Sequence, residues 1–213
     1  NVEFMNDNRH IICASTDRHF GYYALDENEG KIEKDKKGKK QVKLCLHDFS
    51  AQGWVNACTV SPSGTWVVFT SQDAYIRFIR TDQFEEEDKK NAFNINGLPF
   101  LSLQFISDTA LIAGGFDCQP RLFVLKGEQW TDRGFIDVEG IREQSGGGQS
   151  SALAAKRAMF GGPKVTKVSS LHNNVILGIR KTGGNITTCS NDGKIGVWPI
   201  SAIKAHFKDD QIE

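Results

Sequence analysis

The sequence predicts an all-β protein built from repeated antiparallel meanders. One pattern recurs four times along the chain: small or hydroxyl residues, then an aspartate, then a strand-like run. Strand-like segments rich in β-branched and aromatic residues also precede each aspartate, and Pro, Gly, Asn and Asp stand at the breaks between them. The anchoring aspartates are Asp17, Asp73, Asp117 and Asp192.

Residues 54–73, WVNACTVSPSGTWVVFTSQD, show the repeated unit most clearly. VNACTV predicts a first strand, SPSG a turn, TWVVFTS a second strand, and QD the turn before a third. Segments 2–17 and 100–117 follow the same order, and 165–192 has a longer first hairpin. Such a unit cannot bury both of its faces alone, so we expect the units to stack radially as the blades of a β-propeller.

The anchoring aspartates each have the same expected role. Strand residues follow them at one offset, at Tyr22–Tyr23, Phe78–Ile79, Leu122–Phe123 and Val197–Trp198. An aspartate in a tight turn can accept hydrogen bonds from nearby backbone N–H groups and hold the turn between the second and third strands. Because all four occupy the same local frame, this pattern favours a structural role over a catalytic one.

Composition excludes several classes of function. The chain has 213 residues and equal charges, 26 Lys+Arg against 26 Asp+Glu, which argues against bulk nucleic-acid binding. No apolar run is long enough for a membrane-spanning helix. The five cysteines lack CxxC spacing and favour buried free thiols in a reducing compartment. The five histidines lack HxH or HExxH spacing, and no nucleophile motif or phosphate loop is present, so we expect no catalytic residue, metal or cofactor.

The repeated frame resembles the WD-repeat β-propellers, through SPSG at 61–64, SND at 190–192 and VW at 197–198. The chain also resembles the WD-repeat subunit, subunit 1, of the actin-related protein 2/3 complex. The similar segments are, in order, GWVNACTVSPSGTWVVFTSQD, LPFLSLQFISDTALIAGGFDCQPRLFVL, an inserted SSALAAKRAMF, and a last blade that ends in VWPI. The resemblance implies a seven-bladed propeller of which this chain holds about four, the C-terminal ones.

The resemblance also has departures. No copy has a Gly-His pair before its first strand, so the Asp–His–Ser–Trp network of strict WD repeats is expected to be incomplete. We expect Trp198 to be a structural aromatic residue. We expect a partial blade at 1–30, a basic inter-blade loop at 31–48, blades at 49–90 and 91–138, an insert at 139–164, and a last blade with a C-terminal tail at 165–213.

The insert is the first candidate for function. Ser150 or Ser151 can cap a short helix over 151–160, which Gly161–Gly162 would end. At helical spacing its apolar residues share one face, with Lys156 among them and Arg157 at the edge. The resemblance implies a projecting helix that contacts an actin-related subunit, although an aromatic usually stands where this chain has Lys156. The alternative is a solvated Ala-rich loop. The expected contact residues are Ala152, Leu153, Lys156, Arg157, Met159 and Phe160.

Two charged segments are further candidates. GKIEKDKKGKKQVK, 30–43, holds seven Lys against Glu33 and Asp35. Such a run is usually a solvated loop, but it could also reach an acidic partner, including the acidic tails of nucleation-promoting factors. FEEEDKKN, 84–91, is expected to be a solvated acidic loop.

These observations together predict a non-enzymatic scaffold. The resemblance implies a subunit of a hetero-oligomer that helps nucleate branched actin filaments, in the cytoplasmic actin cytoskeleton. Its expected partners are actin-related proteins, other subunits of the complex, the actin filament and nucleation-promoting factors, with no nucleic acid and no membrane span. One alternative is a generic WD-repeat adaptor of a coat or a ubiquitin ligase. Another is a propeller enzyme, which would need His, Asp or Glu converging at the central channel.

Overall fold

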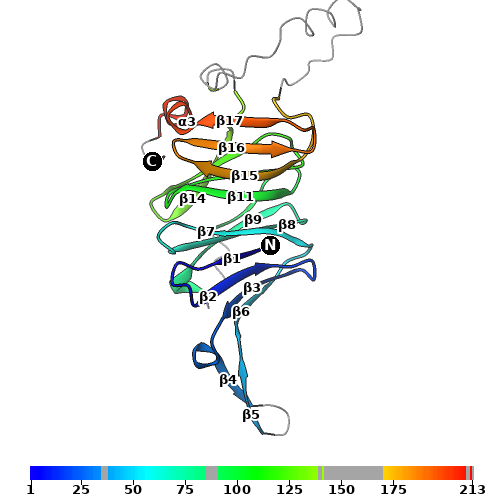
Figure 1. Ribbon diagram of the computed structural model, residues 1–213, viewed down its shortest axis with the longest axis vertical. Coiled ribbons are helices and arrows are strands. Elements are labelled where there is room, and N and C mark those ends of the chain that lie inside the picture. The colour runs from blue at the N-terminus through cyan, green and yellow to red at the C-terminus, as the bar shows by residue number, and fades with distance from the viewer. Residues whose placement is uncertain (35–37, 85–90, 139–140, 142–169, 210–211, 213) are drawn as a thin grey trace, which may run out of the picture.

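A computed structural model describes residues 1–34, 38–84, 91–138, 141, 170–209 and 212. Four antiparallel sheets lie one against the next in chain order (Figure 1). The first contains β1 (Val2–Phe4), β2 (His10–Ala14), β3 (His19–Ala24) and β6 (Cys45–Ser50); the second contains β7 (Val55–Val60), β8 (Trp66–Ser71), β9 (Tyr75–Arg80) and β10 (Ala92–Asn94).

The third and fourth sheets continue the same order. The third contains β11 (Phe100–Ser107), β12 (Ala110–Gly115), β13 (Arg121–Lys126) and β14 (Gln129–Phe135). The fourth has three strands, β15 (Ile176–Thr182), β16 (Asn185–Ser190) and β17 (Ile195–Pro199), followed by the helix α3 (Ile200–Phe207). Short 3-10 turns η1 (Glu27–Glu29) and η2 (Thr81–Gln83) follow β3 and β9.

Alternation along the middle strands divides the hydrophobic residues between two cores. In β8, Val67 and Phe69 belong to the core shared with the first sheet, whereas Trp66 and Val68 belong to the core shared with the third. Successive side chains on a strand point to opposite faces, so a fully apolar strand can serve both. The central sheets are therefore buried on both faces, as propeller blades require, and the predicted fold class is confirmed.

Aromatic rings fill the inter-sheet cores. Phe20 of the first sheet stacks on Phe69 of the second with 4.5 Å between ring centroids. Phe78 of the second sheet stacks on Trp130 of the third at 4.3 Å, and Trp66 meets the same indole edge-on at 5.7 Å. Each such ring removes a large apolar area from water, which stabilises neighbouring blades against one another.

The segment 31–48 differs from the expected inter-blade loop. Its first part forms a two-stranded hairpin of β4 (Lys31–Lys34) and β5 (Lys40–Lys43), and β6 then pairs with β3 to complete the first sheet. The partial blade expected at 1–30 is thus a four-stranded sheet. The many lysines in this segment obscured the alternation that predicts a strand. Phe49 of β6 packs against the core, with its ring centroid 5.9 Å from that of Phe20.

Other boundaries and burial differ from expectation as well. The second sheet extends past residue 90 through β10. The segment 84–91 is not wholly solvated, because Phe84 and Asn91 are buried. The C-terminal tail contains α3, which buries Ile200 and Ile203 against the last core.

The cysteines are free, but only Cys58 is buried, so the expectation of generally buried thiols is wrong. No helix in the described parts of the chain is long and apolar enough to cross a membrane.

Candidate interaction sites

Three of the four anchoring aspartates accept backbone hydrogen bonds within their own turns. Oδ1 of Asp17, Asp73 and Asp192 accepts from the amide two residues onward, each at 3.0 Å, from His19, Tyr75 and Lys194 respectively. This geometry is the Asx turn that short acidic side chains favour. Ala74 and Cys118 have positive φ at the position after their aspartates, as such turns often require.

Three of these aspartates also tie the turn to the start of their own sheet. Asp192 Oδ2 accepts from the Asn173 amide at 2.7 Å, and both carboxylate oxygens of Asp117 accept from the Leu98 amide, at 3.2 and 3.3 Å. Asp73 Oδ2 accepts from the Gln52 amide at 3.3 Å. The contact therefore fastens the segment entering the first strand to the turn between the second and third strands.

The last blade contains a buried polar chain that we did not predict from the sequence. The Trp198 indole donates to Thr188 Oγ1 at 2.9 Å, and Thr188 Oγ1 lies 2.7 Å from His172 Nε2. Because an indole N–H only donates, the threonine hydroxyl accepts from it and keeps a proton and a second lone pair for the contact with the imidazole. His172 Nδ1 lies 3.7 Å from Asp192 Oδ1, beyond hydrogen-bond distance.

Electrostatics agree with this arrangement. Burial lowers the pKa of His172 below its usual range despite the nearby Asp192. Burial would raise the pKa of Asp192, but hydrogen bonds from the Asn173 and Lys194 amides and from Ser190 lower it to about 2. An ionised carboxylate thus faces a neutral imidazole. The Asp, His, Thr and Trp side chains are gathered in this blade, but His172 Nδ1 makes no hydrogen bond, so the network is incomplete between the histidine and the aspartate.

The sequence contained a signal for this set. Leu171, not glycine, precedes His172, so this position does not form the Gly-His pair of strict WD repeats. Its position before the first strand of the blade and the position of Thr188 shortly before Asp192 were the usable cues, since both fall in the same frame as Trp198.

The second blade uses an arginine instead. Arg77 Nη2 donates to Asp73 Oδ2 at 2.7 Å, and Arg77 Nη1 donates to Ser71 Oγ at 2.9 Å and to Asp73 Oδ1 at 3.3 Å. The carboxylate is almost buried, with 9% of its side chain exposed. Burial would raise the pKa of Asp73, but Arg77 and Ser71 hold it below its usual value. A two-pronged ion pair thus takes the place of the His–Trp chain.

The chain segments before and after the insert are in contact with each other. The backbone amide of Leu171 donates to Asp137 Oδ2 at 2.7 Å, so the residues that flank the insert are joined. Ala152, Leu153, Lys156, Arg157, Met159 and Phe160, and the helix expected at 151–160, lie outside the described residues.

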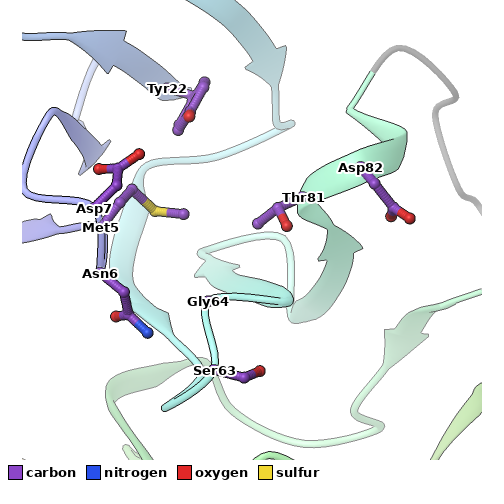
Figure 2. A pocket seen from close by; sticks show the side chains of 8 residues that line it. All are labelled: Met5, Asn6, Asp7, Tyr22, Ser63, Gly64, Thr81 and Asp82. Carbon is purple, nitrogen blue, oxygen red and sulfur yellow. The ribbon is translucent and has the colours of Figure 1, made fainter.

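A pocket of about 400 Å³ opens between the first two blades, at the end where the first strand of each blade turns into the second. Figure 2 shows Met5, Asn6, Asp7 and Tyr22 along one side, with Thr81 and Asp82 across from them. Ser63 and Gly64 complete the lining. The turns between first and second strands supply most of these residues, so blade pairing creates the pocket.

The pocket's ionisable groups already have partners. Asp7 Oδ2 lies 2.6 Å from His10 Nδ1, and Arg80 Nη2 donates to Asp82 Oδ2 at 2.8 Å. Burial and the negative charges of Asp7 and Glu29 raise the pKa of Tyr22 to about 12, so its phenol stays protonated. The protonated phenol of Tyr22 can therefore donate or accept a hydrogen bond at the pocket near neutral pH.

Large apolar side chains are exposed at the end of the blades that carries the aspartate turns. Trp54 is 59% exposed, and Leu98 and Phe116 are 52% and 42% exposed. Each stands just before a first strand or just after a second strand, which meet at the same end of an antiparallel sheet. Exposed aromatic residues of this kind are typical of protein contacts. No group of His, Cys, Asp or Glu suited to a metal ion occurs among the residues that the structure describes.

Comparison with known proteins agrees with this geometry. The family model described as "WD domain, G-beta repeat" matches residues 43–80, which cover β6 and the next three strands. The match therefore begins on the outer strand of one sheet and ends in the next sheet. This WD repeat and the antiparallel four-stranded sheets are consistent with a partial WD β-propeller.

Curated proteins extend the similarity over most of the chain. Actin-related protein 2/3 complex subunit 1A-B of Xenopus laevis is 26% identical over 170 residues, 75% of this chain and 44% of that protein. Subunit 1B-A of the same species is 26% identical over 180 residues, 80% of this chain and 48% of that protein. Subunit 1 of Schizosaccharomyces pombe is 23% identical over 181 residues, 72% of this chain and 47% of that protein. The predicted resemblance is confirmed, and these WD-repeat blades span less than half the length of those relatives.

Proposed function

We propose that these WD-repeat blades belong to a non-catalytic scaffold subunit of an actin-related protein 2/3 complex. The observation that carries the proposal is the similarity to subunit 1 over about three quarters of the chain. Supporting it, three carboxylates at the pocket and the turns, those of Asp7, Asp73 and Asp82, are engaged in structural contacts. The blades hold binding surfaces rigidly, and nucleotide chemistry belongs to the actin-like partners.

The proposed mechanism is presentation of docking surfaces by a stiff frame. The insert acts as an arm whose base is fixed by the bond between Asp137 and Leu171. Its helix docks apolar residues into a groove of an actin-related subunit, a recurring mode of peptide recognition. The rims contact other subunits, the actin filament and nucleation-promoting factors, and the assembly works in the cytoplasmic actin cytoskeleton.

Co-purification tests membership of the complex. The complete protein, tagged and isolated from its own cells, is expected to bring down actin-related proteins and the remaining subunits of that complex. Recovery of coat or ubiquitin-ligase components in their place would contradict the proposal and favour a generic adaptor.

The role of the insert has its own test. Leu153→Asp with Met159→Asp is expected to reduce recovery of the actin-related subunit at least tenfold, because two charges would enter an apolar groove. Ala154→Asp with Ala158→Asp is the matched control, since at about 100° per residue these positions fall on the opposite side of the helix. Equal recovery with both double variants would remove the insert from the mechanism.

A further inference from the structure

The hairpin of β4 and β5 extends away from the four blades at one end of the molecule (Figure 1). Its strands pair with each other only, and all eight of their residues are exposed. A two-stranded hairpin without a covered face is marginally stable in water. Its side chains therefore contribute little to the core and are available to a partner.

The two faces of the hairpin differ in chemistry. Residues directly opposite each other share a face, and the register pairs Ile32 with Val42 and Lys34 with Lys40. These two pairs follow one another on the same face, because side chains alternate along each strand. This apolar-cationic face thus joins an aliphatic pair, in which Ile32 is 69% exposed, to a lysine pair.

The other face has less free charge and no aliphatic pair. It carries Lys31 opposite Lys43 and Glu33 opposite Gln41. Lys43 Nζ lies 3.4 Å from Glu33 Oε1, so one of its two lysines is engaged. Among the residues that the structure describes, no carboxylate forms an ion pair with Lys34 or Lys40. Like charges placed directly opposite are unfavourable, and an external anion would relieve them.

We propose that the apolar-cationic face binds the surface of an anionic phospholipid bilayer. A bilayer interface accepts aliphatic side chains at the acyl boundary and lysine ammonium groups among the head groups, which is the combination of Ile32, Val42, Lys34 and Lys40. Nucleic acid would use the lysines but offers no partner to the aliphatic pair. The four strand cations are all lysines, which act as point charges suited to a diffuse anionic surface.

The position of the hairpin supports this choice. It lies at one extreme of the long axis of the molecule, so a flat surface can reach it without meeting the blades (Figure 1). The chain as a whole has no net charge, with 26 basic and 26 acidic side chains. Attraction to an anionic surface is therefore concentrated at local basic elements such as this one. The proposal is independent of membership of the actin-related complex.

Vesicle sedimentation tests the proposal with the complete protein. Binding is expected to vesicles of phosphatidylcholine with phosphatidylserine and not to vesicles of phosphatidylcholine alone. Lys34→Gln with Lys40→Gln is expected to weaken binding on the order of tenfold or more, at roughly fivefold per lysine. Lys31→Gln with Lys43→Gln is the matched control, with equal loss of charge from the opposite face, and is expected to weaken binding less.

The aliphatic pair separates bilayer binding from charge attraction alone. Ile32→Ser with Val42→Ser keeps every charge, and both residues lie outside the three hydrophobic cores, so folding is preserved as circular dichroism would verify. Weaker binding to the phosphatidylserine vesicles is expected. Unchanged binding of this variant, or equal losses in the two lysine double variants, would overturn the proposal. Binding to polyglutamate or to RNA with no binding to the anionic vesicles would overturn it as well.

Discussion

Removing the Thr188 hydroxyl tests the polar chain of the last blade. Thr188→Val keeps the shape of the side chain but deletes the group that accepts from Trp198 Nε1 at 2.9 Å and lies 2.7 Å from His172 Nε2. Thr188 is 1% exposed and the other two side chains are fully buried, so water cannot replace the lost contacts. Each buried polar group left without a partner costs about 1–3 kcal/mol. Two groups are left without a partner, so the expected loss is about 2–6 kcal/mol.

This loss is large beside the total stability of a domain, which is about 5–15 kcal/mol. The assay is urea unfolding followed by tryptophan fluorescence, with the unfolding free energy extrapolated to water. Thr187→Val is the matched control, because Thr187 is the adjacent residue, points to the other face and is more exposed. Its hydroxyl donates only to the Arg180 carbonyl at 3.2 Å, so the expected change is about 1 kcal/mol or less.

A double-mutant cycle sharpens the test. Trp198→Phe removes the indole donor, so Thr188→Val in that background leaves one orphaned group in place of two. The second substitution should then cost at least about 1 kcal/mol less than it does in the unaltered protein. The energetic role of this polar chain is refuted if Thr188→Val lowers the unfolding free energy no more than Thr187→Val does. It is also refuted if the effects of Thr188→Val and Trp198→Phe simply add, because coupled side chains give non-additive losses.

Three further predictions follow from other contacts. Asp73→Asn should lower the unfolding free energy by about 1–3 kcal/mol because it breaks the nearly buried pair with Arg77, whereas Asp17→Asn, at the equivalent turn of the first blade and without a cation, should cost clearly less in the same urea assay. His172 has a lowered pKa, so its contribution is complete above about pH 6.5 and is lost as the pH falls below that value; His172→Gln should flatten the pH dependence of the melting temperature there, and an unaltered slope would contradict it. Phe78→Ala should cost about 3–5 kcal/mol in calorimetry or urea unfolding, because it empties the stack on Trp130, and a smaller loss than that of the exposed Phe116→Ala would contradict the core assignment.

Local sequence rules determined the repeating frame. Turn residues and alternating apolar runs fix where strands begin and end, since both are short-range properties of the backbone. The strand over 55–60 and the turn at 61–64 were therefore predictable from VNACTV and SPSG. The aspartate turns were predictable for the same reason, because an Asx turn involves residues only two apart.

Only the tertiary structure decided which distant residues meet. His172 and Thr188 contact Trp198 because folding of the last blade brings three separate segments together. The lysines of β4 and β5 predicted a solvated loop, because charge indicates exposure to solvent. Charge does not prevent two exposed strands from pairing, and these two form a hairpin. Spacing in the sequence thus determines the repeat, whereas burial and non-local pairing determine which polar groups lock each blade.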